Sequence, residues 1–111
     1  MNIRRTIRIW ITKRRVRKIM KALNHGLKTR AHLNSIITVL RKSLKEKDHE
    51  FASQLQGNAR HLTDAINTLM LDLAEELQRL DHLGVEVGRL VELTGYTRSQ
   101  LSHVMGKELH E

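Results

Sequence analysis

The sequence predicts a mainly α-helical protein with a short N-terminal β-strand, and three observations support this fold class. The 111 residues include no proline and only six glycines, so few positions force a helix to end. Apolar residues recur at helical spacing over most of the chain. Residues 3–12 instead alternate between two kinds of side chain, as in a strand. We expect a strand, two helices, a long coiled-coil-like helix and a C-terminal helical hairpin.

The strand is predicted from a period of two in residues 3–12. One parity holds Ile3, Arg5, Ile7, Ile9 and Ile11, and the other holds Arg4, Thr6, Arg8, Trp10 and Thr12. A lone strand leaves its backbone hydrogen bonds unmade, so we expect it to pair with the same strand of a second chain in a homodimer. The alternative is one cationic amphipathic helix over residues 2–23 lying on an anionic membrane, with Ile9 on its arginine face and its apolar stripe broken at Arg14.

Two helices should follow the strand. Val16, Ile19, Met20 and Leu23 lie on one helical stripe and predict a helix over residues 13–24. His25 and Gly26 then offer a stop, because glycine readily adopts the left-handed conformation that ends helices. Thr29 is a candidate N-cap for a second helix over residues 29–44, whose apolar positions are Leu33, Ile36, Ile37, Leu40 and Leu44.

A longer helix is predicted over residues 48–83. Its apolar residues recur at steps of three and four and form a coiled-coil-like seam: Phe51, Leu55, Ala59, Leu62, Ile66, Leu69, Leu73, Leu77 and Leu80. An isolated helix would leave this seam in water, so we expect it to pack against another helix.

The C-terminal region predicts a helical hairpin. A short helix from about residue 87 should end at a turn at Gly95 and Tyr96, and Thr97 with Gln100 forms a capping-box pattern that opens the last helix. This run resembles a helix-turn-helix unit, which would place Arg98, Ser99, Gln100 and His103 on the recognition helix. The surrounding acids Glu86, Glu92, Glu108 and Glu111 would repel DNA, so a hairpin that closes the core or mediates association is the alternative.

Charge is divided along the chain. Residues 1–47 hold 15 Lys and Arg against one acid, a net of +14, and residues 48–111 hold five against 11, a net of −6. Dense arginine is typical of a surface that binds polyanions, although a solvated basic tail has the same composition. We therefore predict a basic nucleic-acid-binding head over residues 1–47 and an acidic helical region over residues 48–111 for oligomerisation or a protein partner.

The order strand, helix, turn, helix over residues 3–44 resembles the ribbon-helix-helix family of DNA-binding proteins. The resemblance implies that Arg4, Thr6 and Arg8 contact base edges in the major groove. It implies phosphate contacts from Arg14, Arg15, Arg17, Lys28, Thr29 and Arg30. With a helical tail the chain is also similar to plasmid mobilisation accessory proteins, while repressors and antitoxins share the architecture. We expect a sequence-specific DNA-binding protein in transcription regulation or a relaxosome; an arginine-rich RNA-binding protein is an alternative.

A second resemblance concerns His25 to Thr29, which is similar to the start of the phospho-accepting helix of sensor histidine kinases. Residues 58–80 are similar to the second helix of that domain. The resemblance implies a dimeric helical hairpin that accepts phosphate on His25, or on His32. Gly26 and Arg30 stand where the family has an acidic residue and a proline, and no glycine-rich nucleotide-binding segment is present.

The sequence contains no residue pattern that indicates catalysis, metal binding or a cofactor. The chain contains no cysteine, its histidines lack nearby carboxylates at metal-ligand spacing, and no nucleophile motif or phosphate loop occurs. We expect no enzyme activity, no metal and no cofactor. No apolar run approaches the roughly 20 residues that span a bilayer, so we expect a cytoplasmic protein without a membrane partner.

Overall fold

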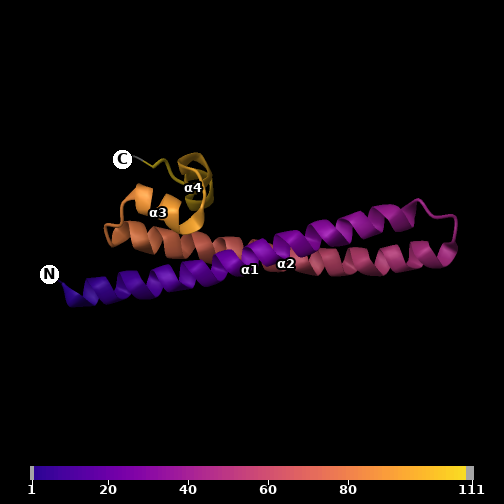
Figure 1. Cartoon of the computed structure of the whole chain (residues 1–111), viewed down its shortest axis with the longest axis horizontal. Coiled ribbons are helices and arrows are strands. Elements are labelled where there is room, and N and C mark those ends of the chain that lie inside the picture. Colours follow the sequence, from indigo (N-terminus) through magenta and orange to yellow (C-terminus); the bar gives the residue numbers. More distant parts are fainter. Residues whose placement is uncertain (1, 110–111) are drawn as a thin grey trace. The chain divides into compact units, whose positions relative to one another are not determined.

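The computed structural model describes residues 2–109 and contains, within them, four helices (Figure 1). They are α1 (Ile3–Arg41), α2 (Glu46–His82), α3 (Val87–Thr94) and α4 (Arg98–Met105). The chain divides into two compact units. Unit 1 comprises Met1–Ala22 with Leu69–Glu111, and unit 2 comprises Leu23–Thr68. The mainly α-helical class is confirmed.

The N-terminal strand was a wrong prediction: residues 3–12 form the first turns of α1, and residues 2–109 contain no strand. The side chains buried in this segment and in the turn that follows it are spaced three and four residues apart, as in a helix. Thr12 is 3% and Val16 0% exposed, and Ile9 is half-buried. The neighbouring isoleucines Ile7 and Ile11 remain exposed. Alternation in the sequence therefore does not correspond to one buried face.

The predicted turn at His25 and Gly26 was also a wrong prediction, because α1 continues through both residues without interruption. Gly26 is buried and does not adopt a positive φ. A Cβ atom on Gly26 would lie 3.2 Å from Cγ1 of Ile66, so the missing side chain allows α2 to approach closely. Thr29 consequently lies inside α1 instead of capping a helix, and the two helices predicted over residues 13–24 and 29–44 are parts of one.

Unit 2 is a hairpin of α1 and α2. Its core contains Ile37, Ala52 and Ala59, with Leu33, Leu40 and Leu55 packed against them. Residues 42–45 connect the helices, and the Ser43 hydroxyl donates a hydrogen bond of 2.6 Å to Oδ2 of Asp48. The predicted long helix is confirmed as α2, although its seam differs at one end: Ala52 is buried, whereas Phe51 is 50% exposed.

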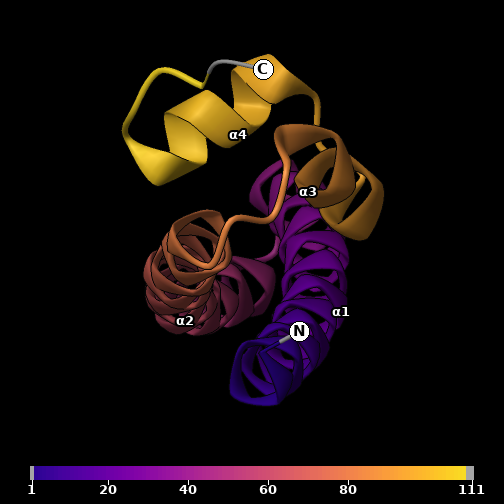
Figure 2. The same ribbon diagram turned by 90° about the vertical axis from the view of Figure 1, so that its left-hand side faces the viewer.

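Unit 1 packs the two short helices on the end of α2 and the first turns of α1 (Figure 2). Its buried apolar residues come from all four helices: Val16, Met20, Leu73, Leu77, Leu80, Val87, Leu90, Leu101 and Met105. α2 ends in a Schellman motif, in which Gly84 has a φ of 86° and the Val85 N–H donates to the Leu80 carbonyl over 3.0 Å. Arg5 donates from Nε to the Leu83 carbonyl over 2.8 Å, which satisfies another carbonyl at this helix end.

Among the residues that the structure describes, no helix combines the length and apolar character needed to cross a membrane.

Candidate nucleic-acid interface

The α3–turn–α4 segment of unit 1 has the geometry of a helix-turn-helix. Only Gly95, Tyr96 and Thr97 separate the two helices. Gly95 has a φ of 73°, and its N–H donates to the Val91 carbonyl over 2.8 Å, which ends α3. The axes of α3 and α4 run across one another in both Figure 1 and Figure 2. A short glycine-containing turn between crossed helices is characteristic of this motif.

The first turn of α4 is held by a capping box, as the sequence predicted. The Thr97 hydroxyl accepts a hydrogen bond of 3.1 Å from the Gln100 N–H. Gln100 Oε1 in turn accepts a hydrogen bond of 2.9 Å from the Thr97 N–H. The side-chain amide oxygen of Gln100 is therefore hydrogen-bonded within the protein and is a poor candidate for contact with a ligand.

α4 has one buried and one exposed face. Leu101 and Met105 are buried, and the Met105 carbonyl accepts a hydrogen bond of 2.9 Å from the Gln78 amide of α2. Ser99 and His103 are exposed on the opposite face, whereas Arg98, three residues before Leu101, lies beside the buried face and lines a cavity with the first residues of α3. The helix is thus anchored through its inner face and presents polar side chains on its outer face, which is how a recognition helix is displayed.

Tyr96 contributes to the packing of the turn. It is half-buried, and burial raises the pKa of its phenol above the ordinary 10.0. Its backbone N–H donates to the Thr94 hydroxyl over 3.1 Å, and that hydroxyl donates to the Leu90 carbonyl over 2.8 Å. Together these bonds order the chain between α3 and α4.

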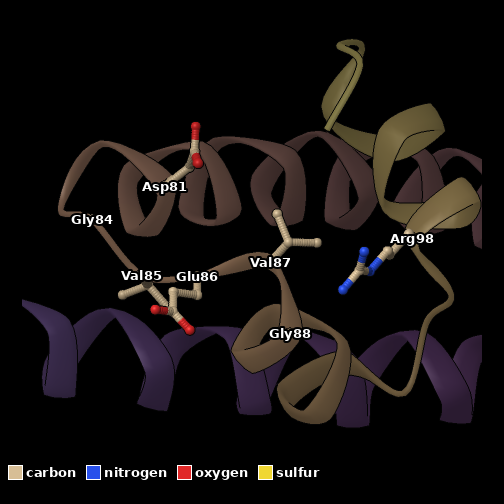
Figure 3. A pocket seen from close by; sticks show the side chains of 7 residues that line it. All are labelled: Asp81, Gly84, Val85, Glu86, Val87, Gly88 and Arg98. Atoms are coloured by element: carbon tan, nitrogen blue, oxygen red, sulfur yellow. The ribbon is translucent and has the colours of Figure 1, made fainter. Parts of the chain in front are cut away.

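A cavity of about 530 Å³ adjoins α4 (Figure 3). Residues from the end of α2, the connection to α3, and the first residues of α3 and α4 line it: Asp81, Gly84, Val85, Glu86, Val87, Gly88 and Arg98. The Arg98 side chain extends toward the start of α3, whereas the carboxylates of Asp81 and Glu86 point to different sides (Figure 3). Asp81 forms an ion pair with Lys107. The lining brings no pair of carboxylates together for acid–base chemistry.

Unit 1 has a positive net charge despite the acids around α3 and α4. It holds 13 Lys and Arg against eight Asp and Glu, a net of +5. Lys13 and Arg17 of α1 line one cavity with Glu92 of α3, and the Arg15 guanidinium lies 3.8 Å from the Glu76 carboxylate. The sequence analysis led us to expect that the acids around α3 and α4 would repel DNA. The cations of α1 in the same unit offset that repulsion.

The three residues predicted to contact bases lie on α1 in unit 1. Arg4, Thr6 and Arg8 are exposed. Arg4 and Arg8 are four residues apart and share a helical face, but Thr6 does not, because residues two apart diverge on a helix. The Thr6 hydroxyl donates to the Asn2 carbonyl over 3.2 Å. The ribbon that would have aligned all three is absent from the described residues, and their contact with bases stays a prediction.

The residues predicted to contact phosphate are divided between the units. Arg14, Arg15 and Arg17 are exposed on α1 of unit 1. In unit 2, Lys28 is exposed, whereas Thr29 and Arg30 are half-buried, and the Arg30 guanidinium donates to the Thr63 hydroxyl over 3.5 Å. The first three belong to the same unit as α4; the sequence pattern did not indicate this grouping, since it comes from the pairing of α1 with α2.

His25 is exposed in unit 2, as is His32 one heptad later. Within residues 2–109 no group of three His, Cys, Asp or Glu side chains could hold a metal ion. Phosphate transfer through His25 stays a prediction.

No family model matches the chain, and neither the curated proteins nor the solved structures searched include a match to it.

Proposed function

We propose that the protein binds double-stranded DNA, with α4 in the major groove and the basic surface of α1 in unit 1 on the phosphate backbone. The observation that carries the proposal is the α3–turn–α4 segment, in which α4 is anchored through Leu101 and Met105 and exposes Ser99 and His103 on its outer face. Serine and histidine side chains can each donate or accept hydrogen bonds at base edges. Ser99 and His103 replace Arg4, Thr6 and Arg8 as our candidates for reading sequence.

The charge of unit 1 supports the same proposal. Arg14 and Arg17 are exposed on α1 and lie in the unit that contains α4. Contacts between such side chains and phosphates supply affinity without sequence preference. Base preference and backbone affinity should therefore depend on different helices.

We also propose that two copies bind together, although the strand pairing from which a homodimer was predicted does not occur in the described residues. Each copy presents one recognition helix, and one helix covers only a few base pairs. Paired helix-turn-helix units contact half-sites about 10 base pairs apart, so the selected site should be an inverted repeat of roughly that spacing.

The test is selection from a random duplex DNA pool at two salt concentrations, followed by sequencing of the retained DNA. We expect wild type to enrich a motif, and a Ser99→Ala/His103→Ala variant to retain salt-sensitive binding while losing the enrichment. An Arg14→Ala/Arg17→Ala variant should keep the motif but bind more weakly, with the slope of log affinity against log salt reduced by about 0.9 for each lost phosphate contact.

Two outcomes contradict the proposal. Wild type that binds DNA without enriching any sequence shows that no element reads bases. An α4 variant that enriches the wild-type motif shows that the reading element lies elsewhere, and an Arg4→Ala/Arg8→Ala variant then distinguishes α1 as that element. Circular dichroism of each variant establishes that the helices are intact.

A further inference from the structure

The first turns of α1 in unit 1 expose four large apolar side chains on one face. They are Ile3, Ile7, Trp10 and Ile11, which are 71%, 50%, 57% and 38% exposed. Their spacing of four, three and one residues places them along one side of a helix. We call this face the Ile–Trp stripe. Single exposed apolar residues are ordinary on a protein surface, but four on one face form a patch.

The stripe is surrounded by positive charge. Residues 2–21 contain nine Lys and Arg and no acid. Helical geometry puts Arg4 and Arg8 on one flank of the stripe and Arg17 on the other, while Arg14 and Lys18 continue its line toward the C-terminus. The Arg14 guanidinium lies 5.6 Å from the centre of the Trp10 ring. Long cationic side chains arranged in this way can extend past an apolar surface to reach anionic groups beside it.

The opposite face of the same turns is already packed within unit 1. Thr12 and Val16 are buried, and Arg5 is bonded to the end of α2. α1 therefore does not need to bury the stripe in order to be held in place. The stripe is left facing outward with its apolar side chains in water.

We propose that the Ile–Trp stripe docks on the surface of an anionic phospholipid bilayer. An interfacial helix combines isoleucine and tryptophan, which enter the boundary between headgroups and acyl chains, with arginine and lysine, which bind lipid phosphates. A second copy of this surface would set nine cations against nine. Duplex DNA complements the charge but offers little apolar surface for three isoleucines. A bilayer that contains anionic lipid supplies both.

Trp10 provides the measurement, because it is the one tryptophan of the chain. We expect vesicles of phosphatidylglycerol and phosphatidylcholine to shift its fluorescence emission to shorter wavelength and to protect it from a water-soluble quencher. Phosphatidylcholine vesicles at the same lipid concentration should have a much smaller effect, and added salt should weaken binding. No response to the anionic vesicles, or an equal response to both kinds, overturns the proposal.

Substitution distinguishes the stripe from general attraction between charges. An Ile3→Ser/Ile7→Ser variant keeps every cation and should lower the partition coefficient for anionic vesicles by about tenfold or more. Leu71→Ser is the matched control, since Leu71 is an α2 residue of unit 1 that is 73% exposed, and it should bind as wild type does. Equal binding by the double variant and wild type would contradict docking through the stripe.

Duplex DNA separates this proposal from the DNA-binding function. The Ser99→Ala/His103→Ala variant should partition onto vesicles as wild type does, because α4 takes no part in the stripe. A Trp10 spectrum that responds to DNA in the way described above but not to anionic vesicles would assign the stripe to nucleic acid and overturn the lipid proposal.

Discussion

Gly26 occupies a position in α1 where Ile66 of α2 approaches the backbone. A Cβ atom there would lie 3.2 Å from Ile66 Cγ1, and Ile66 is buried, so little room exists for it to move. Alanine favours a helix over glycine by about 0.5–1 kcal/mol, whereas overfilling a packed core costs about 1–3 kcal/mol. We expect Gly26→Ala to lower the free energy of unfolding by about 1 kcal/mol, measured by urea denaturation.

Gly57 in α2 is the matched control for this prediction. A Cβ atom on Gly57 would meet nothing within 4 Å, so Gly57→Ala should gain helix propensity without a clash and stabilise the protein by about 0.5–1 kcal/mol. If both substitutions stabilise the protein equally, Gly26 is not required for close packing.

Tyr96 should make unit 1 sensitive to alkaline pH. Burial raises the pKa of its phenol in the folded state above 10.0, so the folded protein holds this proton more tightly than the unfolded chain. The stabilisation is complete below pH 10 and is lost as pH rises through the folded-state pKa. Tyr96 is the one tyrosine of the chain, so its ionisation can be followed directly by ultraviolet absorbance. A titration midpoint at or below 10 in the folded protein would contradict this prediction.

At the scale of elements, α4 depends on its capping box. Without the Thr97 hydroxyl the Gln100 N–H loses its acceptor, although the bond from the Thr97 N–H to Gln100 remains possible. We expect Thr97→Ala to cost about 1 kcal/mol of unfolding free energy and Thr97→Ser to cost much less. Hydrogen exchange at the first turn of α4 is the second measurement, and unchanged protection in Thr97→Ala would argue against a role for the cap.

The elements differ in how far the sequence predicted them. The capping box was predictable, because Thr97 and Gln100 lie three residues apart and the side chain of each bonds the backbone N–H of the other. The helical conformation of residues 3–12 was not predictable, because an alternation such as theirs occurs both in a strand and in a helix whose outer face is apolar. Gly26 was interpreted as a stop because its local preference is for turns, whereas its function depends on Ile66, 40 residues away. The signal that spans Gly26 is a heptad seam through Thr12, Val16, Ile19, Leu23, Gly26, Arg30, Leu33, Ile37 and Leu40.

In the candidate site, too, features set by neighbouring residues were predictable and features set by distant residues were not. Arg98, Ser99, Gln100 and His103 were assigned to one helix from local spacing, and the structure places all four on α4. That basic residues of α1 share unit 1 with that helix was not predictable from composition. It depends on the pairing of α1 with α2, which brings together residues far apart in the chain.

At the scale of the whole molecule, the cations of α1 repel one another. Arg14 and Lys18, like Arg17 and Lys21, are four residues apart and on the same face, and no acid lies within residues 2–21 to separate such pairs. Salt screens this repulsion, so we expect the melting temperature followed by circular dichroism to rise by a few degrees between low and physiological ionic strength. A short polyanion should have the same effect at a far lower concentration if it binds the folded protein, whose cations are held on one helix, more tightly than the unfolded chain. A melting temperature independent of both would contradict the prediction.

The short connection between α1 and α2 also bears on how unit 2 forms. Leu40 of α1 and Ala52 of α2 are only 12 residues apart, because the connection over residues 42–45 is short. The contacts between the helices nearest this connection therefore close a small loop, at low entropic cost. Each later layer adds contacts to helices that the previous layer has already aligned. Unit 2 should consequently assemble by zipping outward from residues 42–45, and Ile37 and Ala52 should be structured in the folding transition state before Gly26 meets Ile66.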